Sequence, residues 1–361
     1  MKILHIVEDF SVKSGGLRTV IKNLDFNLKK LGFSSHILAA DKEKDDAIFV
    51  VNASNKWLFS KQWKNKILKI IDEENIELIH IHGAWLYPQF IGAKIAAQKK
   101  IPMVLSLHGM FQPWLWKKGT LKKKIYFYLF SKKHFSKAKI IHSITNEETK
   151  VIKNFFKNNI VVEIPNLITL DETSDNVEIN KNNIVYLGRL NKTKGIDLLI
   201  KTFSKIENDE IKLIIAGRFN AYKTELESLV NSLNIKEKVT FLGEVKGEEK
   251  KKLTQSAWVM ASPTFSDVIG MVNLEAASLK TPIITTNKTG LHKDWNLNGG
   301  RLINPNIKEL KKALEEALDW SLEDRIAQGE LLFNFVRKEY SWKNRMNDWE
   351  LLYKKALTHE K

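Results

Sequence analysis

Short runs of β-branched and apolar residues alternate along this chain with longer amphipathic stretches, and this alternation narrows the possible folds more than any other feature. Apolar runs without polar interruption are typical of parallel strands that are buried on both faces. In the first half the expected strands are Ile3–Glu8, Ser35–Ala39, Leu78–His82, Met103–His108, Ile140–Ile144 and Ile160–Ile164. The helices expected between them include Gly16–Leu31, Lys61–Glu74 and Glu147–Phe156.

The pattern starts again after a polar stretch, Asp171–Asn183, which we interpret as a linker. The strands expected beyond it are Ile184–Leu187, Ile211–Ala216, Val239–Leu242, Trp258–Ala261 and Pro282–Thr286. The helices expected there include Gly195–Ile206, Lys223–Leu233 and Leu274–Leu279. Alternation in both halves predicts an α/β protein with two doubly wound, Rossmann-like domains, and 361 residues suffice for two such cores.

We expect one domain over residues 1–170 and a second over residues 171–340. The remaining residues, 341–361, contain an amphipathic helix, Trp342–Leu357, with Trp349, Leu352 and Tyr353 on its apolar side. Ligands of doubly wound sheets bind at the carboxyl ends of the strands, so two facing domains would enclose a central cleft.

Composition excludes several classes of protein. The chain has no cysteine, which rules out a disulfide scaffold, a thiolate metal site and a cysteine nucleophile. Its first eight residues resemble a strand rather than a signal peptide, and no stretch approaches the roughly 18 apolar residues of a membrane span. We therefore expect a cytoplasmic protein.

The formal net charge of +16 is unevenly distributed. Residues 1–165 carry a net +14 and residues 166–361 only +2, and Leu78–Asn146 contains 12 lysines without any Asp or Glu. Such asymmetry favours an anionic partner, which at this point is a nucleic acid, a membrane lipid or a phosphorylated ligand.

Two glycine-containing turns precede expected helices. Gly15 and Gly16 stand between the first strand and its helix, where unpaired N–H groups could face an anion. They form neither a G-x-G-x-x-G nor a P-loop pattern, which disfavours dinucleotide oxidoreductases and P-loop enzymes. In the second half Gly188-Arg189-Leu190 is followed by Lys194 and Gly195, and two cations at a helix start suit a diphosphate.

The most specific segment contains two carboxylates, Asp267 and Glu275, eight positions apart around Gly270. A carboxylate can accept two hydroxyl hydrogen bonds from a ribose or another sugar. These segments together resemble the retaining glycosyltransferases of family 4, which have the two-domain GT-B fold. That family carries E-P-F-G-L-V-V-L-E-A where this chain has Asp267-Val268-Ile269-Gly270-Met271-Val272-Asn273-Leu274-Glu275-Ala276. The resemblance extends in order through Gly15-Gly16, His108-Gly109, Pro165-Asn166, Gly188-Arg189-Leu190, Lys194-Gly195, Thr281–Thr286 and Gly299–Pro305.

The resemblance implies a metal-independent, retaining hexosyltransferase that uses a UDP or GDP sugar and no cofactor. Its acceptor would be a glycan or a polyprenyl-linked glycan, in bacterial-type polysaccharide, lipopolysaccharide or glycoconjugate synthesis. The implied catalytic residues are His108, Arg189 and Lys194. Donor binding would fall to Gly15, Gly16, Asp267, Gly270 and Glu275, with Val245 lining the base pocket.

Two departures from the family pattern leave the donor sugar less defined than the activity. Asp267 stands where the family usually has glutamate, and Ile269 stands where it has phenylalanine. No Asp-x-Asp motif occurs, which argues against a metal-clamped diphosphate. We expect attack on the face that the leaving group vacates, with the leaving phosphate accepting the acceptor's proton.

Three histidines allow more than one interpretation. His80 and His82 alternate on one strand and share a face, which suits either a structural or acceptor-side role or, with a third ligand that the sequence does not reveal, a metal. His108 is either a satisfied core histidine or, as the resemblance implies, a group beside the reacting sugar.

Aromatic residues and lysines are interleaved within the acid-free region, in a lysine–aromatic segment that spans residues 114–133. It contains Trp114, Trp116, Lys117 and Lys118, and then Lys122–Lys133. This composition favours contact with an anionic membrane surface, although a surface helix with inward aromatics has the same pattern. A nucleotide-sugar epimerase or a phosphorylase of the same fold, and a basic nucleic-acid-binding protein, remain alternatives; no nucleic-acid motif is present, and we expect no such partner.

Overall fold

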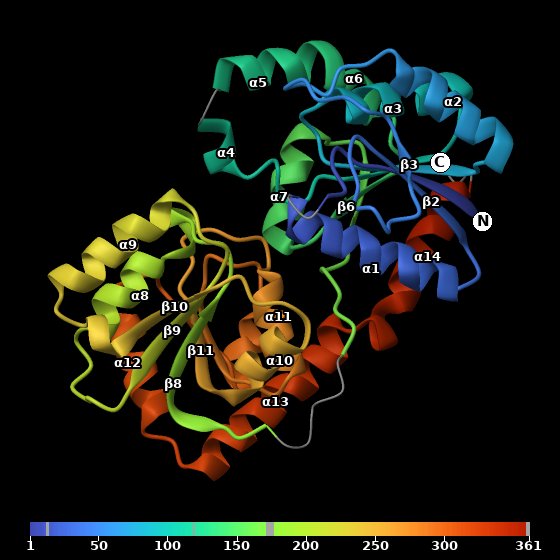
Figure 1. The fold of residues 1–361 in the computed structure, drawn as a ribbon. Coiled ribbons are helices and arrows are strands. Elements are labelled where there is room, and N and C mark those ends of the chain that lie inside the picture. The colour runs from blue at the N-terminus through green and yellow to red at the C-terminus, as the bar shows by residue number, and fades with distance from the viewer. Residues whose placement is uncertain (12–13, 118–119, 171–176, 359–361) are drawn as a thin grey trace. The chain divides into compact units, whose positions relative to one another are not determined.

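The computed structural model describes residues 1–361 except 12–13, 118–119, 171–176 and 359–361, and leaves the side chains of residues 114, 117 and 120 undescribed. The chain forms two compact units (Figure 1). Unit 1 comprises Met1–Leu167 and Arg345–Lys361, and unit 2 comprises Ile168–Asn344.

Unit 1 is built on a seven-stranded sheet of order β3-β2-β1-β4-β5-β6-β7, and all of its paired strands are parallel. The strands are β1 (Lys2–Ile6), β2 (Ser34–Ala39), β3 (Phe49–Val50), β4 (Leu78–His82), β5 (Met103–Ser106), β6 (Ile140–Ser143) and β7 (Ile160–Glu163). β4, β5 and β6 are buried along their whole length, as their apolar sequences predict. This order reverses direction between β1 and β4, which is a common ligand position in open α/β sheets.

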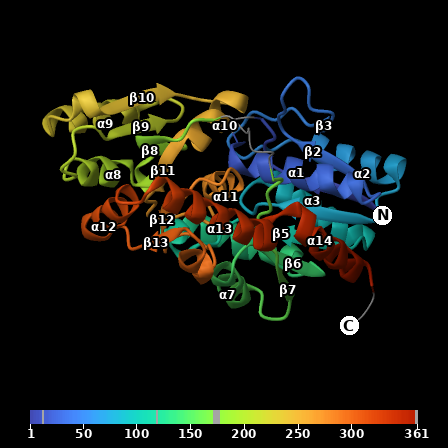
Figure 2. The same cartoon turned by 90° about the horizontal axis from the view of Figure 1, so that it is seen from below.

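Helices connect these strands and contribute apolar side chains to a large hydrophobic cluster and to a smaller one beside α1. They are α1 (Gly16–Lys30), α2 (Gln62–Glu74), α3 (Tyr87–Lys99), α4 (Pro113–Lys117), α5 (Thr120–Tyr126), the π-helical η2 (Phe127–Ser131), α6 (Lys132–Phe135) and α7 (Asn146–Phe155). The last helix, α14 (Trp342–Leu357), packs on the sheet near β4 and β6 (Figure 2). Its predicted apolar residues Trp349, Leu352 and Tyr353 are all buried.

Unit 2 contains a parallel six-stranded sheet of order β10-β9-β8-β11-β12-β13. The strands are β8 (Asn180–Leu187), β9 (Lys212–Ala216), β10 (Val239–Gly243), β11 (Ala257–Ser262), β12 (Ile283–Thr286) and β13 (Arg301–Ile303). Its α-helices are α8 (Ile196–Phe203), α9 (Ala221–Ser232), α10 (Gly247–Ser256), α11 (Met271–Ser278), α12 (Ile307–Leu318) and α13 (Leu322–Tyr340), with short 3-10 turns η3 (Lys192–Lys194), η4 (Lys236–Lys238) and η5 (Lys293–Leu297).

The structure confirms two doubly wound α/β units and corrects the predicted linker. Asn180–Asn183 belong to β8, since Asn180 pairs with Ala257 and Asn183 with Lys212. Residues 171–176 of the predicted linker lie outside the described residues. Among the described helices, none combines the length and the apolar character needed to cross a bilayer.

Candidate active site

The residues singled out in the sequence lie where strands end and helices begin. In unit 2, Arg189 and Lys194 follow β8, Val245 follows β10, and Asp267 follows β11, while Gly270 immediately precedes α11 and Glu275 lies within it. In unit 1, Gly15 and Gly16 begin α1, His82 ends β4 and His108 follows β5. Because all strands within a sheet are parallel, each set gathers at the carboxyl edge of its own sheet.

The loop that carries Arg189 and Lys194 is packed tightly against the loop after β11. Gly195 has a positive φ of 68°, and a Cβ placed on it would lie 2.1 Å from Pro263 O. The Thr193 carbonyl accepts hydrogen bonds from Phe265 N at 2.8 Å and from Thr264 Oγ1 at 2.9 Å. The two loops therefore hold their side chains in a fixed relation to one another.

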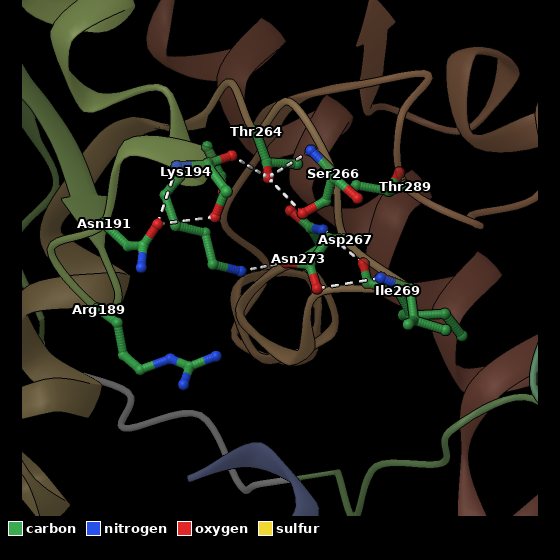
Figure 3. A network of polar contacts seen from close by, with 12 residues as sticks. Arg189, Asn191, Lys194, Thr264, Ser266, Asp267, Ile269, Asn273 and Thr289 are labelled. Carbon is green, nitrogen blue, oxygen red and sulfur yellow. Dashed lines mark hydrogen bonds and ion pairs between the residues drawn. The ribbon is translucent and has the colours of Figure 1, made fainter. Parts of the chain in front are cut away.

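The two predicted cations differ in their contacts (Figure 3). Lys194 Nζ forms an ion pair with Asp267 Oδ2, and both side chains are about one-fifth exposed, at 20% and 22%. Arg189 is exposed, and within the described part of the chain no carboxylate forms an ion pair with it. Arg189 is thus a ready anion ligand, whereas Lys194 is held beside the carboxylate.

Gly270 permits a close turn between the two carboxylates. Its φ is 72°, and a Cβ on it would approach Asn273 Nδ2 to 2.8 Å and Asp267 Oδ2 to 3.0 Å. Asn273 Nδ2 donates to Ile269 O at 2.8 Å and so stabilises the start of α11. Sequence reasoning missed the role of Asn273, although it lies within the quoted motif.

Glu275 also has a cationic neighbour. Lys250 Nζ, from α10, lies 2.8 Å from Glu275 Oε2, and the Glu275 side chain is 24% exposed. Nothing in the sequence linked Lys250 to Glu275, because the contact arises from the packing of α10 beside α11. Val245 is buried and, with Leu242, Lys252 and Leu253, lines an open depression of about 460 Å³.

In unit 1 the glycine pair leaves space at the start of α1. A Cβ on Gly15 or on Gly16 would meet no atom of the described residues within 4 Å, and only Gly15, at φ 62°, needs a left-handed backbone. The first turn of α1 contains no acidic residue, so its unpaired N–H groups remain suited to an anion.

His82 and His108 belong to a row of histidines that contact one another. His5 Nδ1 lies 2.9 Å from His82 Nε2, and His82 Nδ1 lies 2.9 Å from His108 Nε2. Burial lowers the pKa of His5 to about 4, that of His108 to about 3 and that of His82 well below its usual range. All three rings are therefore neutral near pH 7.

His80 has a separate set of partners and is also near His5. Its Nδ1 lies 2.7 Å from Tyr353 Oη and its Nε2 lies 2.7 Å from Ser106 Oγ. Ligand atoms of His5, His80 and His82 lie within 4.8 Å of one another, so the third candidate ligand that the sequence did not reveal is His5. Both nitrogens of His80 and of His82 already face hydrogen-bond partners, which fits a polar network better than a metal centre.

Two carboxylates at this edge, the buried Glu148 and the partly buried Glu8, were not predicted. Glu148 accepts from Gly109 N at 2.6 Å and from Ile144 N at 2.7 Å, and thereby ties the loops after β5 and β6 together. Glu8 accepts from Gln89 Nε2 at 3.1 Å. Burial raises the pKa of both carboxyl groups. A buried Glu on a helix start gives no distinct sequence signal.

The lysine–aromatic segment divides into an inward and an outward part. Trp116 is half-buried, and its Nε1 donates to Phe111 O at 3.1 Å. Lys118 lies outside the described residues, as do the side chains of Trp114 and Lys117. Five large apolar side chains further on are exposed: Leu121, Ile125, Tyr128, Leu129 and Phe130.

Comparison with known proteins matches both halves of the chain to glycosyltransferases. Residues 14–172 match the model of Glycosyltransferase Family 4, and residues 171–330 match that of Glycosyl transferases group 1. An uncharacterised glycosyltransferase of Methanocaldococcus jannaschii is 27% identical over 83% of this chain and 80% of its own. The gpi3 subunit of a phosphatidylinositol N-acetylglucosaminyltransferase from Schizosaccharomyces pombe is 24% identical over 76% of this chain and 60% of its own.

The solved structures show the same architecture. An Anabaena protein crystallised with UDP and glucose superimposes with a TM-score of 0.75 at 15% identity, over 98% of this chain and all of that one. Two parallel-sheet units in this order, with matching family models on each half, define the GT-B fold. The chain is a member of the family 4, or group 1, glycosyltransferases.

Proposed function

We propose that this glycosyltransferase moves a hexose from a UDP or GDP sugar to a glycan or polyprenyl-linked acceptor, without a metal and with retention of configuration. The observation that carries the proposal is that two cations lie on one loop and differ in their ion pairs. Arg189 has no ion pair with a carboxylate of the described residues, whereas Lys194 forms one with Asp267. Both stand just before α8, whose amino-terminal end adds a positive partial charge.

These groups would neutralise the diphosphate as it leaves. Departure of a nucleoside diphosphate builds negative charge on the β-phosphate, and preorganised cations lower that barrier by roughly 3 kcal/mol each. Arg189 would bind the diphosphate directly, and Lys194 would exchange or share Asp267 with a phosphate oxygen. No metal is needed if the two cations and the helix end carry this charge.

The two carboxylates would hold hydroxyl groups of the donor. Glu275 would accept hydrogen bonds from the ribose, and Asp267 from the transferred sugar, next to the narrow turn at Gly270. The Anabaena structure, which holds UDP and glucose, supports a nucleotide-sugar donor here. Because Asp267 is one methylene shorter than the usual glutamate, its preferred sugar would sit deeper toward Lys194.

Transfer would occur on the face that the diphosphate leaves. The bond between the anomeric carbon and the phosphate oxygen breaks, and a bond from that carbon to the acceptor oxygen forms on the same side. The proton of the acceptor hydroxyl passes to the departing phosphate, so the charges balance without a separate general base.

A panel of nucleotide sugars, followed by thermal shift and by slow hydrolysis, tests the donor site. The true donor should raise the melting temperature by mass action, and Arg189→Gln should abolish that rise. Arg337→Gln, an exposed arginine on α13, is the matched control and should respond like the wild type. If Arg189→Gln binds the donor normally, the assignment of the diphosphate to this loop is wrong.

We further propose that the exposed part of the lysine–aromatic segment docks on the inner face of the cytoplasmic membrane. Leu121 and Leu129 are 72% and 70% exposed, and Lys122, Lys124 and Lys133 beside them are exposed as well. Exposed apolar residues with cations and no acidic neighbours in sequence suit the headgroup boundary of an anionic bilayer. The lipid moiety in the name of the Schizosaccharomyces relative also supports a lipid-linked acceptor.

Vesicle sedimentation tests this surface. Vesicles with anionic lipid should retain the wild type at low salt, and each lysine contributes about 1 kcal/mol. The triple variant Lys122→Gln, Lys124→Gln, Lys133→Gln should therefore bind about 100-fold more weakly. A control with Lys205→Gln, Lys308→Gln and Lys343→Gln, all exposed in unit 2, should bind like the wild type. Equal losses in both variants would mean that only net charge matters.

A further inference from the structure

The segment between β3 and α2 presents two aromatic side chains that no part of the proposed reaction uses. Trp57 is 49% exposed and Phe59 is 53% exposed, and Leu58 between them is half-buried. Exposed apolar side chains that adjoin one another are less common than single ones, and they mark a candidate contact surface. Residues 55–59 are called the aromatic loop below.

Asn55 holds the aromatic loop in one shape. Its side-chain oxygen accepts from Trp57 N at 3.1 Å and from Phe59 N at 2.9 Å, and its Nδ2 donates to Phe59 O at 2.7 Å. Leu58 has a φ of 52°, in the left-handed region, and its carbonyl accepts from Nε1 of the buried Trp63 at 2.9 Å. These hydrogen bonds offset the cost of the left-handed residue, so a preformed turn presents the two rings.

The aromatic loop is joined to the lysine–aromatic segment at the start of α3. Trp57 O accepts from Tyr87 N at 3.1 Å, and Leu86 O accepts from Tyr126 Oη at 2.9 Å. Two adjacent residues thus bind one element each. The rings of Trp57 and Tyr126 also contact one another directly, with centroids 5.6 Å apart.

Aromatic rings form one continuous row across both elements. Consecutive ring centroids lie 4.7–6.1 Å apart, the spacing of contacting aromatic pairs, in the order Phe59, Tyr87, Phe90, Phe130, Tyr126 and Trp57. Phe130, which lies in the lysine–aromatic segment, is 49% exposed, like the two rings of the loop. The exposed rings of the two elements therefore belong to one surface.

The sequence around the aromatic loop is cationic and lacks acidic residues. Residues 47–71 contain five lysines and no Asp or Glu. Lys56, Lys61 and Lys64 are exposed, and within the described part of the chain none of them forms an ion pair. Cations around amphipathic rings suit the headgroup region of an anionic bilayer. A second copy of this chain would instead bring lysines against lysines, which disfavours a homodimer through this surface.

We propose that the aromatic loop is a second membrane-contact element, which places Trp57 and Phe59 in the headgroup boundary of the anionic membrane that the lysine–aromatic segment contacts. The inference rests on the membrane docking that we propose for that segment. Because the loop is preformed, it loses little conformational entropy when it inserts. Two contact elements from distant parts of the sequence would also fix the orientation of unit 1 on the bilayer, since a single element leaves rotation about its axis free.

Single introduced cysteines test the insertion, because the chain has no cysteine of its own. The vesicles contain phosphatidylcholine and phosphatidylglycerol. On these vesicles a spin label at Phe59→Cys, which leaves Trp57 in place, should become accessible to oxygen and protected from a water-soluble nickel complex. A label at Leu129→Cys, in the lysine–aromatic segment, should respond in the same way. A label at Ser232→Cys, exposed on α9 of unit 2, should stay in water.

The two labels distinguish failure of the loop from failure of the docking. If the label at position 59 stays in water while that at position 129 inserts, the aromatic loop is not a contact element, although the docking of the lysine–aromatic segment stands. If both labels stay in water, the docking is wrong and the inference falls with it. A wild-type dimer in sedimentation that is lost in Trp57→Ser would assign the loop to a second copy and overturn the proposal.

Salt separates the contribution of the loop from that of the lysines. Trp57→Ser should weaken vesicle binding about 10-fold at low and at high salt, because burial of an apolar ring is not screened. The loss in the triple variant Lys122→Gln, Lys124→Gln, Lys133→Gln should shrink as salt is added.

Phe26→Ser is the matched control for Trp57→Ser. It removes a ring that is 52% exposed from α1, which packs in the smaller hydrophobic cluster of unit 1, and it should bind vesicles like the wild type. Equal losses in Trp57→Ser and Phe26→Ser would overturn the proposal. So would a loss in Trp57→Ser that disappears at high salt.

Discussion

Gly195 shows how a single residue positions the cations of unit 2. We predict that Gly195→Ala lowers the free energy of unfolding by about 2–4 kcal/mol, the sum of a left-handed backbone and of overpacking against Pro263. Loss of the nucleotide-sugar thermal shift should accompany it, because the loop with Lys194 must move. Urea unfolding measures the first effect. Gly16→Ala, whose added Cβ would meet no atom of the described residues within 4 Å, should leave stability nearly unchanged; equal destabilisation would contradict this account.

At the scale of single residues, the charged residues of the unit 2 site were predicted from the sequence, but their ion-pair partners were not. Asp267 and Glu275 were predicted from their spacing around Gly270, whereas their contacts with Lys194 and Lys250 depend on loop and helix packing. The same holds in unit 1. His80 and His82 were predicted to share a face, but His5 joins them only because β1 pairs with β4, which places His5 opposite His80.

Among the elements, α13 stabilises the sheet of unit 2 through one buried arginine. Arg325 donates to the carbonyls of Trp258, Lys280, Gln255 and Ala257 at 3.2, 3.1, 3.4 and 2.7 Å. Burial lowers its pKa to about 10, so it stays charged near neutral pH. Three of these carbonyls, those of Gln255, Ala257 and Trp258, lie at the start of β11, the strand that leads to Asp267.

We therefore predict that Arg325→Leu lowers the free energy of unfolding by about 3 kcal/mol, because it leaves several buried carbonyls without a donor. Urea unfolding at pH 7 provides the measurement. Arg337→Leu on the same helix is exposed and should cost less than about 0.5 kcal/mol. A loss below 1 kcal/mol for Arg325→Leu would show that water replaces the guanidinium.

Some element boundaries were predicted and others were not. β4 was predicted at its observed bounds, and so was the amphipathic helix α14. β8 was predicted four residues too short, because asparagines are poor strand formers and only pairing with β9 and β11 extends the strand. The strand predicted to reach His108 ends at Ser106, where the chain turns into the left-handed region.

In the whole molecule, the histidines are unevenly distributed, and we therefore expect the two units to respond differently to acid. Unit 1 contains His5, His80, His82 and His142, which are buried, and His108, which is partly buried, whereas the histidine of unit 2, His292, is exposed. Burial lowers the pKa of His5 and His142 to about 4 and that of His108 to about 3, and lowers those of His80 and His82 well below 6.5. Between about pH 6.5 and pH 4 the unfolded chain therefore binds more protons than the folded chain. The free energy of unfolding thus decreases as the pH is lowered.

The opposite contribution in unit 1 comes from Glu8 and Glu148, whose raised pKa values favour the folded state as pH falls. The two carboxyl groups offset only part of the stability that the five imidazoles remove as pH falls. Each imidazole changes the free energy of unfolding by up to about 1.4 kcal/mol per pH unit in that window. We predict that unit 1 loses stability before unit 2 when pH is lowered from 7 to 5. Hydrogen exchange, corrected for its intrinsic pH dependence, should show loss of protection in β1, β4, β5 and β6 while β8, β9 and β11 stay protected.

The variant His142→Gln separates this linkage from general acid sensitivity. It removes one titrating group, so the stability lost between pH 7 and pH 5 should shrink by about 1–2 kcal/mol even though the variant is less stable at pH 7. His292→Gln in unit 2 is the matched control and should not alter the loss. Parallel loss of protection in both units would attribute the acid response to net charge rather than to the buried histidines. If protection is lost only in unit 1, and if His142→Gln reduces that loss, then the neutral histidines of unit 1 determine its response to acid.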